Sequence, residues 1–585
     1  MHRLPNSYYW STQIAHVLIC ALILLGTSPL VLAQDSTAPQ KNNLLKDPGP
    51  GVSPVRRIER ETNHKKRRRP LTSDQHNIDG SNNNLLDPEM NAAGTPLRRA
   101  MQAKYADGVA QMVGQNYPNP RAVSNSVNAQ NSSIKNIMNA SDFLWQWGQF
   151  VDHDIDLTDG ANPPEHANIL IPAGDPMFDP DTTGAVEMVF NRSIYDTTTG
   201  TGNDNPRQQF NEITGWIDGS QIYGSDDERA LALRTNDGTG QLRTSSGQLL
   251  PFNTVGLPNA GGTSDTLFLA GDVRANEQVG LTALHTLFVR EHNRLAIKIA
   301  KRKPSLSGEQ IYQKTRRQVV AQLQVITYNE FLPALLGKNA LAPYKGYQPQ
   351  LDASIMNEFS TAAYRLGHTL VSPQLLRLDA KGNEISAGHL PIRNAFFAPH
   401  RLINEGGIEP VLRGLANQPC QALDVYIIDD LRNFLFGAPG QGGFDLAALN
   451  IQRGRDHGLP RYNDARKAMG LARKNSFSEV SSDPEVQARL ASIYVSVDDI
   501  DFWVGGLSEN HIKGALTGEL FFTVLKKQFE VLRDGDRFWY QRTLSRNKQR
   551  AIARTRLADI IRRNTTIKRR EIPKNVFHVQ AAAKR

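Results

Sequence analysis

Trp147-Gly148-Gln149-Phe150-Val151-Asp152-His153-Asp154 is the stretch that decides how this sequence folds and functions. It lies at the end of a helix predicted over residues 141–154. Residues three and four positions apart share a helix face, which groups three polar side chains beside Trp145: Gln149, Asp152 and His153. An amide, a carboxylate and an imidazole together form either a buried polar network or a catalytic floor. Taken alone, the trio favours the buried network, and further stretches of the chain, given below, reverse that interpretation.

Helical patterns dominate the chain from about residue 78 to 563. Ser141 or Asp142 is a suitable cap for the first long helix. The chain is predicted to be helical from Arg274 onward. Apolar residues between Leu281 and Ile299 recur there at helical spacing. Further helices are predicted at 308–336, 352–366, 425–437, 482–495 and 515–533. Strand signals are few and short, and there is no internal repeat. We therefore expect a mainly α fold, a single large helical domain with few short strands.

An apolar run over residues 13–33 is typical of a signal peptide, with cleavage before Gln34. The alternative is a membrane anchor, but Ser28-Pro29 interrupts the run, and no later run is long enough to span a bilayer. We expect an exported protein, secreted or periplasmic. Of the two cysteines, Cys20 would leave with the signal. Cys420 would then stay as a structural thiol or, less favoured, pair between molecules.

The net charge of +9 is concentrated in two flanks. Residues 56–69 hold eight Lys and Arg against two Glu, and residues 562–585 hold eight against one. We divide the chain into a signal peptide (1–33), a flexible basic arm (34–77), a folded domain (78–563) and a basic tail (564–585). The flanks suit an anionic surface or are solvated linkers, and export makes nucleic acid a poor partner.

Alternating acids after His153 resemble an EF-hand loop, but Leu157 stands where glycine is needed and Pro163 where glutamate is needed. Calcium ligands can still come from another loop, and hard oxygen donors recur in Thr214-Gly215-Trp216-Ile217-Asp218-Gly219-Ser220. Asp154 would add a carboxylate. A hydrogen-bonded turn is the alternative. Two other polar residues, His285 and His292, are seven apart on one helix side; core histidines are favoured over metal ligands.

Several stretches in order resemble the animal haem peroxidase family, the peroxidase–cyclooxygenase superfamily, and cover roughly residues 75 to 545. They are 147–154, 214–225, 270–277, 284–296, 365–370, 448–462 and 498–507. Any one is weak, and the ordered set is specific. The resemblance implies haem b between the 141–154 helix and the helix ending at His368. Animal members carry several disulfides; with none available here, the resemblance points to a bacterial branch.

On the proximal side, the resemblance implies that His368 ligates the iron and that Asn450 orients its imidazole. Arg365 matches a family residue that binds a haem propionate, and Arg453 is a second candidate for this role. On the distal side, His153 matches the acid–base residue.

Other distal roles follow from the same resemblance. Arg274 matches the cation beside His153, and Gln149 the amide that orders water or halide. Asp152 and Glu277 match two carboxylates that form esters with the haem. Gln278 stands where one family member has a methionine in a third link, so no third link is expected. The calcium site would comprise Asp154, Thr214, Trp216 (through its carbonyl), Asp218 and Ser220.

The predicted activity is oxidation of a halide, a pseudohalide or a small phenol by hydrogen peroxide. One alternative is a fatty-acid dioxygenase of the cyclooxygenase type, which needs a tyrosine three residues before the proximal histidine. Arg365 occupies that place, and Tyr364 lies one residue earlier. The other alternative is a catalytically silent haem-binding matrix protein, which loss of the catalytic residues would indicate. All of them are present. Bromide, iodide or thiocyanate is favoured over chloride, and the oligomeric state is open.

Overall fold

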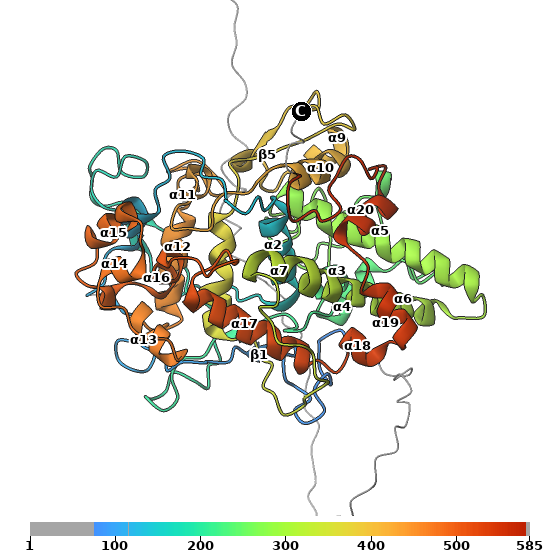
Figure 1. Ribbon diagram of the computed structural model, residues 1–585, viewed down its shortest axis with the longest axis horizontal. Helices are drawn as coiled ribbons and strands as arrows, with labels where there is room; N and C mark the ends of the chain where they lie inside the picture. Colours follow the sequence, from blue (N-terminus) through green and yellow to red (C-terminus); the bar gives the residue numbers. More distant parts are fainter. Residues whose placement is uncertain (1–74, 115, 581–585) are drawn as a thin grey trace, which may run out of the picture.

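Helix α2 (Phe143–Ile155) crosses the middle of the molecule, as Figure 1 shows. The structure is a computed structural model that describes residues 75–114 and 116–580. Apolar residues occur around the whole circumference of α2, so the helix is buried on most sides. Trp147 is fully buried, with ring centroids 5.6 Å from Phe150 and 5.7 Å from Phe288. Phe288 lies on α5 (Val279–Arg302), so aromatic packing joins the two helices.

Of the two residues predicted to cap α2, only Ser141 bonds to its first turn, where its Oγ accepts the Phe143 N–H at 3.3 Å. Asp142 is the N-cap residue, but its carboxylate accepts no backbone N–H there. Ser141 also donates its hydroxyl to the carbonyl of Val576. Both residues therefore make tertiary contacts as well, which a local sequence pattern does not report.

The predicted helices form with shifted bounds. The region from Arg274 becomes helical only at Val279, with Gln278 as the N-cap that accepts from Gly280 N. The 352–366 segment splits into α8 (Asn357–Thr361) and a 3-10 segment (Ala363–Thr369), because Ala362 leaves helical dihedral angles. The 425–437 segment keeps one turn, α11 (Asp429–Arg432). The 482–495 and 515–533 predictions correspond to α15 (Pro484–Ala491) and α17 (Glu519–Asp534).

The remaining helices are short apart from α6 and α12. They are α1 (Pro120–Val123), α3 (Ser220–Tyr223), α4 (Asp227–Leu233), α6 (Gly308–Ile326), α7 (Leu332–Leu336), α9 (His400–Asn404), α10 (Glu409–Asn417), α12 (Leu446–Asp456), α13 (Tyr462–Ala468), α14 (Phe477–Val480), α16 (Phe502–Ser508), α18 (Tyr540–Thr543), α19 (Arg546–Ile552) and α20 (Leu557–Asn564). The strands form three antiparallel pairs: β1 (Thr95–Pro96) with β4 (Phe210–Asn211), β2 (Ile169–Leu170) with β3 (Glu187–Met188), and β5 (Gln374–Leu375) with β6 (Leu390–Pro391). The mainly α class and the single large helical domain are confirmed.

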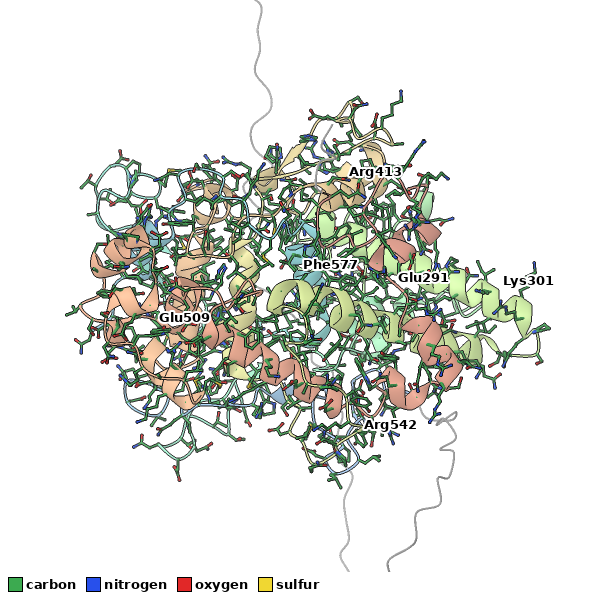
Figure 2. All side chains as sticks on the ribbon, viewed as in Figure 1. Glu291, Lys301, Arg413, Glu509, Arg542 and Phe577 are labelled. Carbon is green, nitrogen blue, oxygen red and sulfur yellow. The ribbon has the colours of Figure 1, made fainter. Side chains whose placement is uncertain are left out.

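The segment predicted as a basic tail from residue 564 packs into the body up to residue 580. Val576 and Phe577 are fully buried, and Figure 2 shows Phe577 beside α2 at the centre of the molecule. The Phe577 ring lies edge-on to Trp147 at 6.2 Å. The predicted boundary at residue 563 is therefore wrong, because two apolar residues inside a cationic segment close the core over α2.

Buried ion pairs and packing, and not disulfides, hold the described segments of the chain together. Cys420 is a buried free thiol, as expected for a structural role. Arg121 at the start of α1 pairs with Asp175 and with Asp445, both at 2.7 Å and all three out of solvent. Removing one member of such a buried set costs about 3–5 kcal/mol, because the other charges lose their compensation. These pairs hold long surface segments against α12.

The signal peptide and nearly all of the basic arm lie outside the described residues, so both stay predictions. In the described part of the chain no helix is both long and apolar enough to cross a membrane. His76, at the end of the predicted arm, packs against Phe538 at 4.1 Å between ring centroids. The folded body therefore begins at or before residue 76.

Candidate active site

A cavity of about 410 Å³ lies between α2 and the 3-10 segment Ala363–Thr369. His153 from α2 and His368 from the 3-10 segment both line it. The sequence predicted these two histidines as the two faces of one site. Apolar side chains from several elements line the rest, including Phe331, Phe396 and Phe436. Its size and its mixed apolar and polar lining are typical of a cofactor or ligand pocket.

His153 is buried and faces two carboxylates. Its Nδ1 lies 3.4 Å from Asp272 Oδ1, and its Nε2 lies 4.0 Å from Glu277 Oε2. Burial holds the pKa of His153 well below its ordinary value, and the nearby Arg274 lowers it further. The imidazole is therefore neutral at pH 7, as predicted, although burial contributes more than the arginine. A neutral imidazole can accept a proton.

Arg274 lies in the turn before α5, not at the start of the helix as predicted. Asp272 holds it in a two-pronged ion pair, accepting from Nε and from Nη2 at 2.9 Å each. Arg274 Nη1 faces Asp152 at 3.4 Å. The carboxylate of Asp272 has its pKa held well below the usual range, despite burial, because Arg274 compensates its charge. A charged aspartate therefore contacts both distal groups.

Gln149 lines the cavity with Asp152 and His153, on the shared helix face that the spacing predicts. Its amide nitrogen donates to Glu277 Oε2 at 2.9 Å, and its oxygen accepts from Gln278 at 3.1 Å. Burial raises the pKa of Glu277 to about 7, and it raises the pKa of Asp152 as well. Gln149, Asp152 and Glu277 all line the cavity, so the structure places the predicted distal residues together.

On the opposite face, His368 contacts Asn450 of α12, with 2.7 Å between the side-chain amide nitrogen and Nδ1. Exchanging the amide nitrogen and oxygen gives Asn450 an acceptor for the Nδ1–H, and its oxygen has no other partner among the described residues. Nε2 is then the ring nitrogen without a proton, and its lone pair can bind a metal. Burial lowers the pKa of His368 to about 3, so the ring is neutral. A neutral, oriented imidazole fits a metal ligand.

Two arginines line the same cavity. Arg365 is three residues before His368, and in a 3-10 segment residues three apart eclipse one another. Its Nε donates to Ser360 O at 3.0 Å. Arg453 lies over the Phe190 ring, and its Nη1 donates to Asp456 at 3.0 Å. Both are placed to meet carboxylates of a bound group, although Asp456 already uses one nitrogen of Arg453.

The five predicted calcium ligands gather in one buried cluster at the C-terminal end of α2. Asp154 accepts from Ser220 N at 2.6 Å, and Asp218 accepts from Thr214 Oγ1 at 3.1 Å. Burial raises the pKa of both carboxyls. One guanidinium, that of Arg316, reaches Asp218 at 3.4 Å. Two buried carboxylates with hydroxyl and carbonyl oxygens fit a hard cation, because a cation would offset charge that burial disfavours.

A glycine connects this cluster with the distal face. Gly271 precedes Asp272, and a Cβ added there would lie 2.2 Å from Ser220 O. The cluster loop and the Asp272 turn therefore touch backbone to backbone.

His285 and His292 are core residues, as favoured from the sequence. His285 contacts the Gln221 carbonyl at 3.0 Å, and His292 lies between the Tyr223 hydroxyl and the Gly240 carbonyl at 2.9 and 3.0 Å. Burial lowers the pKa of each to about 4. Neither lines the cavity.

The main residue that sequence reasoning missed is Asp272. Asp272 lies inside the stretch Ala270 to Glu277 that carries the family resemblance, but the sequence predicts no catalytic or binding role for it. Its position two residues before Arg274 was the available signal. The apolar half of the cavity was also missed, because its members come from distant segments: Phe331, Leu335, Ile392, Phe396, Leu431, Leu435, Phe436 and Phe444.

Comparison with known proteins agrees with this geometry. The family described as Animal haem peroxidase matches residues 75–577. Peroxinectin A from Dictyostelium discoideum is 37% identical over 83% of this chain and 92% of its own length. Thyroid peroxidase from Sus scrofa is 36% identical over 86% of this chain, which spans 60% of that relative. The solved structure of peroxidase A from Dictyostelium discoideum superimposes with a TM-score of 0.80 at 35% identity, covering 87% of this chain and all of that one.

The fold and the two-histidine cavity thus define a haem-binding oxidoreductase of mainly helical architecture. The chain belongs to the animal haem peroxidase family, and it is a haem peroxidase. A fatty acid alpha-dioxygenase from Oryza sativa shares the fold, with a TM-score of 0.72 at 22% identity.

Proposed function

We propose that the cavity holds haem b on His368 and that hydrogen peroxide reacts on the His153 side. The reaction oxidises a halide, a pseudohalide or a small phenol. One observation carries this proposal: two neutral histidines from different elements line one cavity, and only one of them is held by an amide. When bound, the haem supplies the iron and the store of oxidising equivalents, and the protein supplies placement and electrostatics.

His153 moves the proton in this proposal. Its Nδ1 faces Asp272, so Nε2 is the nitrogen that takes the proton from peroxide and returns it to the departing oxygen. The low pKa of His153 keeps this nitrogen unprotonated before peroxide arrives. Asp272 then stabilises the imidazolium that forms, since an anion beside a new cation lowers its energy in a buried site.

Arg274 and Gln149 stabilise and orient the reactants. Arg274 stays charged, because its ion pair with Asp272 raises its pKa. A fixed guanidinium lowers the energy of negative charge that develops on the leaving oxygen. Gln149, held between Glu277 and Gln278, presents an amide that orders water or a halide at the same face.

Covalent attachment is the next part of the proposal. Asp152 and Glu277 line the cavity on the α2 side and are candidates for two ester bonds to the haem. Gln278 replaces a third linking residue and bonds to Gln146 and Gln149 instead. Extraction with acidified organic solvent tests this directly: release of unmodified haem from the wild type would exclude the esters, whereas Asp152→Asn with Glu277→Gln should release it.

We also propose calcium at the cluster of Asp154, Thr214, Trp216, Asp218 and Ser220. Two buried carboxylates with raised pKa values support it. Chelation at pH 7 should lower the thermal midpoint and slow the peroxide reaction together, because the cluster loop touches Gly271. Asp218→Asn is the matched variant that should abolish the response to chelator. An unchanged midpoint with no bound calcium by atomic absorption would remove this part.

The test of the whole proposal is an absorption spectrum of the purified protein with and without peroxide, followed by a panel of bromide, iodide, thiocyanate, chloride and a phenol. Haem absorbance that peroxide changes and a donor restores is expected. A protein that takes up haem but never responds to peroxide would instead support a silent haem-binding role. Oxygen uptake with a polyunsaturated fatty acid would indicate a dioxygenase.

A further inference from the structure

The carboxylate of Asp142 is used in an unusual way for a helix N-cap. Residues of this type normally accept a backbone N–H of the first turn. Asp142 Oδ1 instead accepts from the Trp145 indole Nε1–H at 3.0 Å and from the Ser372 hydroxyl at 2.7 Å. Its Oδ2 is buried and has no partner among the described residues. Asp142 thus does not cap the helix, and its fully buried carboxylate is placed against an indole.

Trp145 is the tryptophan that faces the haem cavity. It lines the cavity one turn before Gln149 and two turns before Asp152 on the same helix face. Trp147, two residues later, points away from that face. It is fully buried, and its Nε1–H donates to the uncharged hydroxyl of Thr327 at 3.2 Å. The two neighbouring tryptophans therefore differ in both respects that matter for redox chemistry: access to the cavity and the charge of the N–H acceptor.

An indole ring is an electron-rich group that can lose one electron. The product carries a positive charge, which a carboxylate at hydrogen-bond distance stabilises strongly where the surroundings are apolar. The hydrogen bond is charge-assisted, so the N–H proton also has an acceptor. Burial raises the pKa of Asp142 to about 7, so near neutrality the carboxyl can both take up and return a proton.

We propose that Trp145 and Asp142 form a redox site that gives one electron to the oxidised haem and so stores one of the two oxidising equivalents of peroxide. This inference rests on the proposed occupation of the cavity by haem. Two electrons are needed to reduce hydrogen peroxide to water, and Trp145 supplies one of them. Trp145 becomes an indole radical, and its N–H proton moves toward Asp142.

A donor then restores the pair. A phenol loses one electron to the Trp145 radical, the proton held at Asp142 returns to the indole nitrogen, and the phenol releases its own proton to solvent. The second equivalent is discharged by a second phenol. Storage on a residue splits the two-electron oxidation into one-electron steps, so it favours phenolic donors over halides, which are oxidised by two electrons at once. The site thereby narrows the donor class left open above.

The first experiment needs no variant. Haem-loaded wild-type protein is frozen milliseconds after mixing with one equivalent of peroxide and no donor, and its electron paramagnetic resonance spectrum is recorded. Protein with ring-deuterated tryptophan should give a narrower radical signal than unlabelled protein. Ring-deuterated tyrosine should leave the signal unchanged. Narrowing with tyrosine only, or a sulfur-centred radical on the nearby Cys420, would overturn the assignment.

Three variants locate the radical. Trp145→Phe should lose the tryptophan signal, and Trp147→Phe, the matched control, should keep it. Asp142→Asn keeps a hydrogen-bond acceptor but removes the charge, so the signal should decay faster while haem absorbance is unchanged. In steady state, Trp145→Phe should lower phenol turnover several-fold and leave bromide oxidation equal or higher. A tryptophan signal that persists in Trp145→Phe, or one unaffected by Asp142→Asn, would refute the proposal.

Failure of the wider function has a different signature. If peroxide leaves the absorption spectrum of the loaded wild type unchanged, the proposed peroxide chemistry is wrong. If the spectrum responds but no tryptophan radical accumulates in wild type at any mixing time, only the Trp145 site is wrong. The two outcomes are read in the same mixing experiment.

Discussion

The two faces of the cavity differ in how many charged groups surround the histidine. The proximal face holds one neutral imidazole, His368, contacted by one amide, Asn450, on a short 3-10 segment. The distal face holds an imidazole within reach of two carboxylates and a buried ion pair, since Asp272 and Glu277 face His153 and Asp272 binds Arg274. A metal ligand needs a fixed lone pair and little else. A group that moves protons needs charges that are already in place when the proton arrives.

The largest effect is expected on the proximal face, at His368. Among the described residues, His368 is the one imidazole on the proximal face, so for His368→Ala we expect loss of haem absorbance and of all peroxide reactivity. Titration with haem, followed by absorbance, measures this. Added imidazole should restore part of the absorbance by filling the space left by the ring. Haem binding equal to wild type without imidazole would contradict the assignment of His368 as ligand.

On the distal face, His153→Ala should keep the haem and slow the reaction with peroxide by about 10²–10⁴-fold, the usual contribution of a positioned acid–base group. Stopped-flow mixing with peroxide measures the rate. His285→Gln is the control, because its ring centroid lies 6.4 Å from that of His153 but the side chain does not line the cavity. An unchanged rate in His153→Ala would exclude its role.

Asp272→Asn separates the distal charge from the distal contacts with peroxide, because it alters the charge without removing a group that touches peroxide. Arg274 loses its two-pronged partner and His153 its facing anion, so we expect a peroxide rate lower by about 100-fold through misplacement. Haem affinity should change little, since the proximal face is untouched. A loss of haem affinity that matches the loss of rate would show that Asp272 supports the fold and not the distal geometry.

The smallest effect concerns pH and a histidine outside the cavity. His292 has its pKa lowered by burial to about 4, so the unfolded chain binds the proton more tightly than the folded one. The contribution of the neutral His292 to the free energy of unfolding is fully present above about pH 6.5 and is lost as the pH falls toward 4. At pH 5 the loss is about 2 kcal/mol relative to pH 7. Urea unfolding should show a smaller loss between pH 7 and 5 for His292→Gln than for wild type; equal losses would exclude this linkage.

Much of the site was predictable because its residues lie in short, ordered stretches. Gln149, Asp152 and His153 follow from helical spacing, and His368 with Asn450 from the family resemblance. Where prediction failed, the deciding contact came from elsewhere in the chain. Asp142 does not cap α2, because Ser372 and Trp145 take its oxygen. The segment after residue 564 is not a free tail, because Phe577 closes the core over Trp147.

The sequence by itself determined the helical class and the shared helix face of Gln149, Asp152 and His153, since periodic spacing is a local property, and its family resemblance indicated the two histidines and the type of chemistry. The tertiary structure alone decided which carboxylate sits beside His153, where α5 begins, and which acceptors bind the indole N–H groups of Trp145 and Trp147. Those outcomes depend on burial and on contacts between segments far apart in the chain. A hydrogen bond or a pKa is set by what surrounds a group in space, which no spacing along the chain specifies.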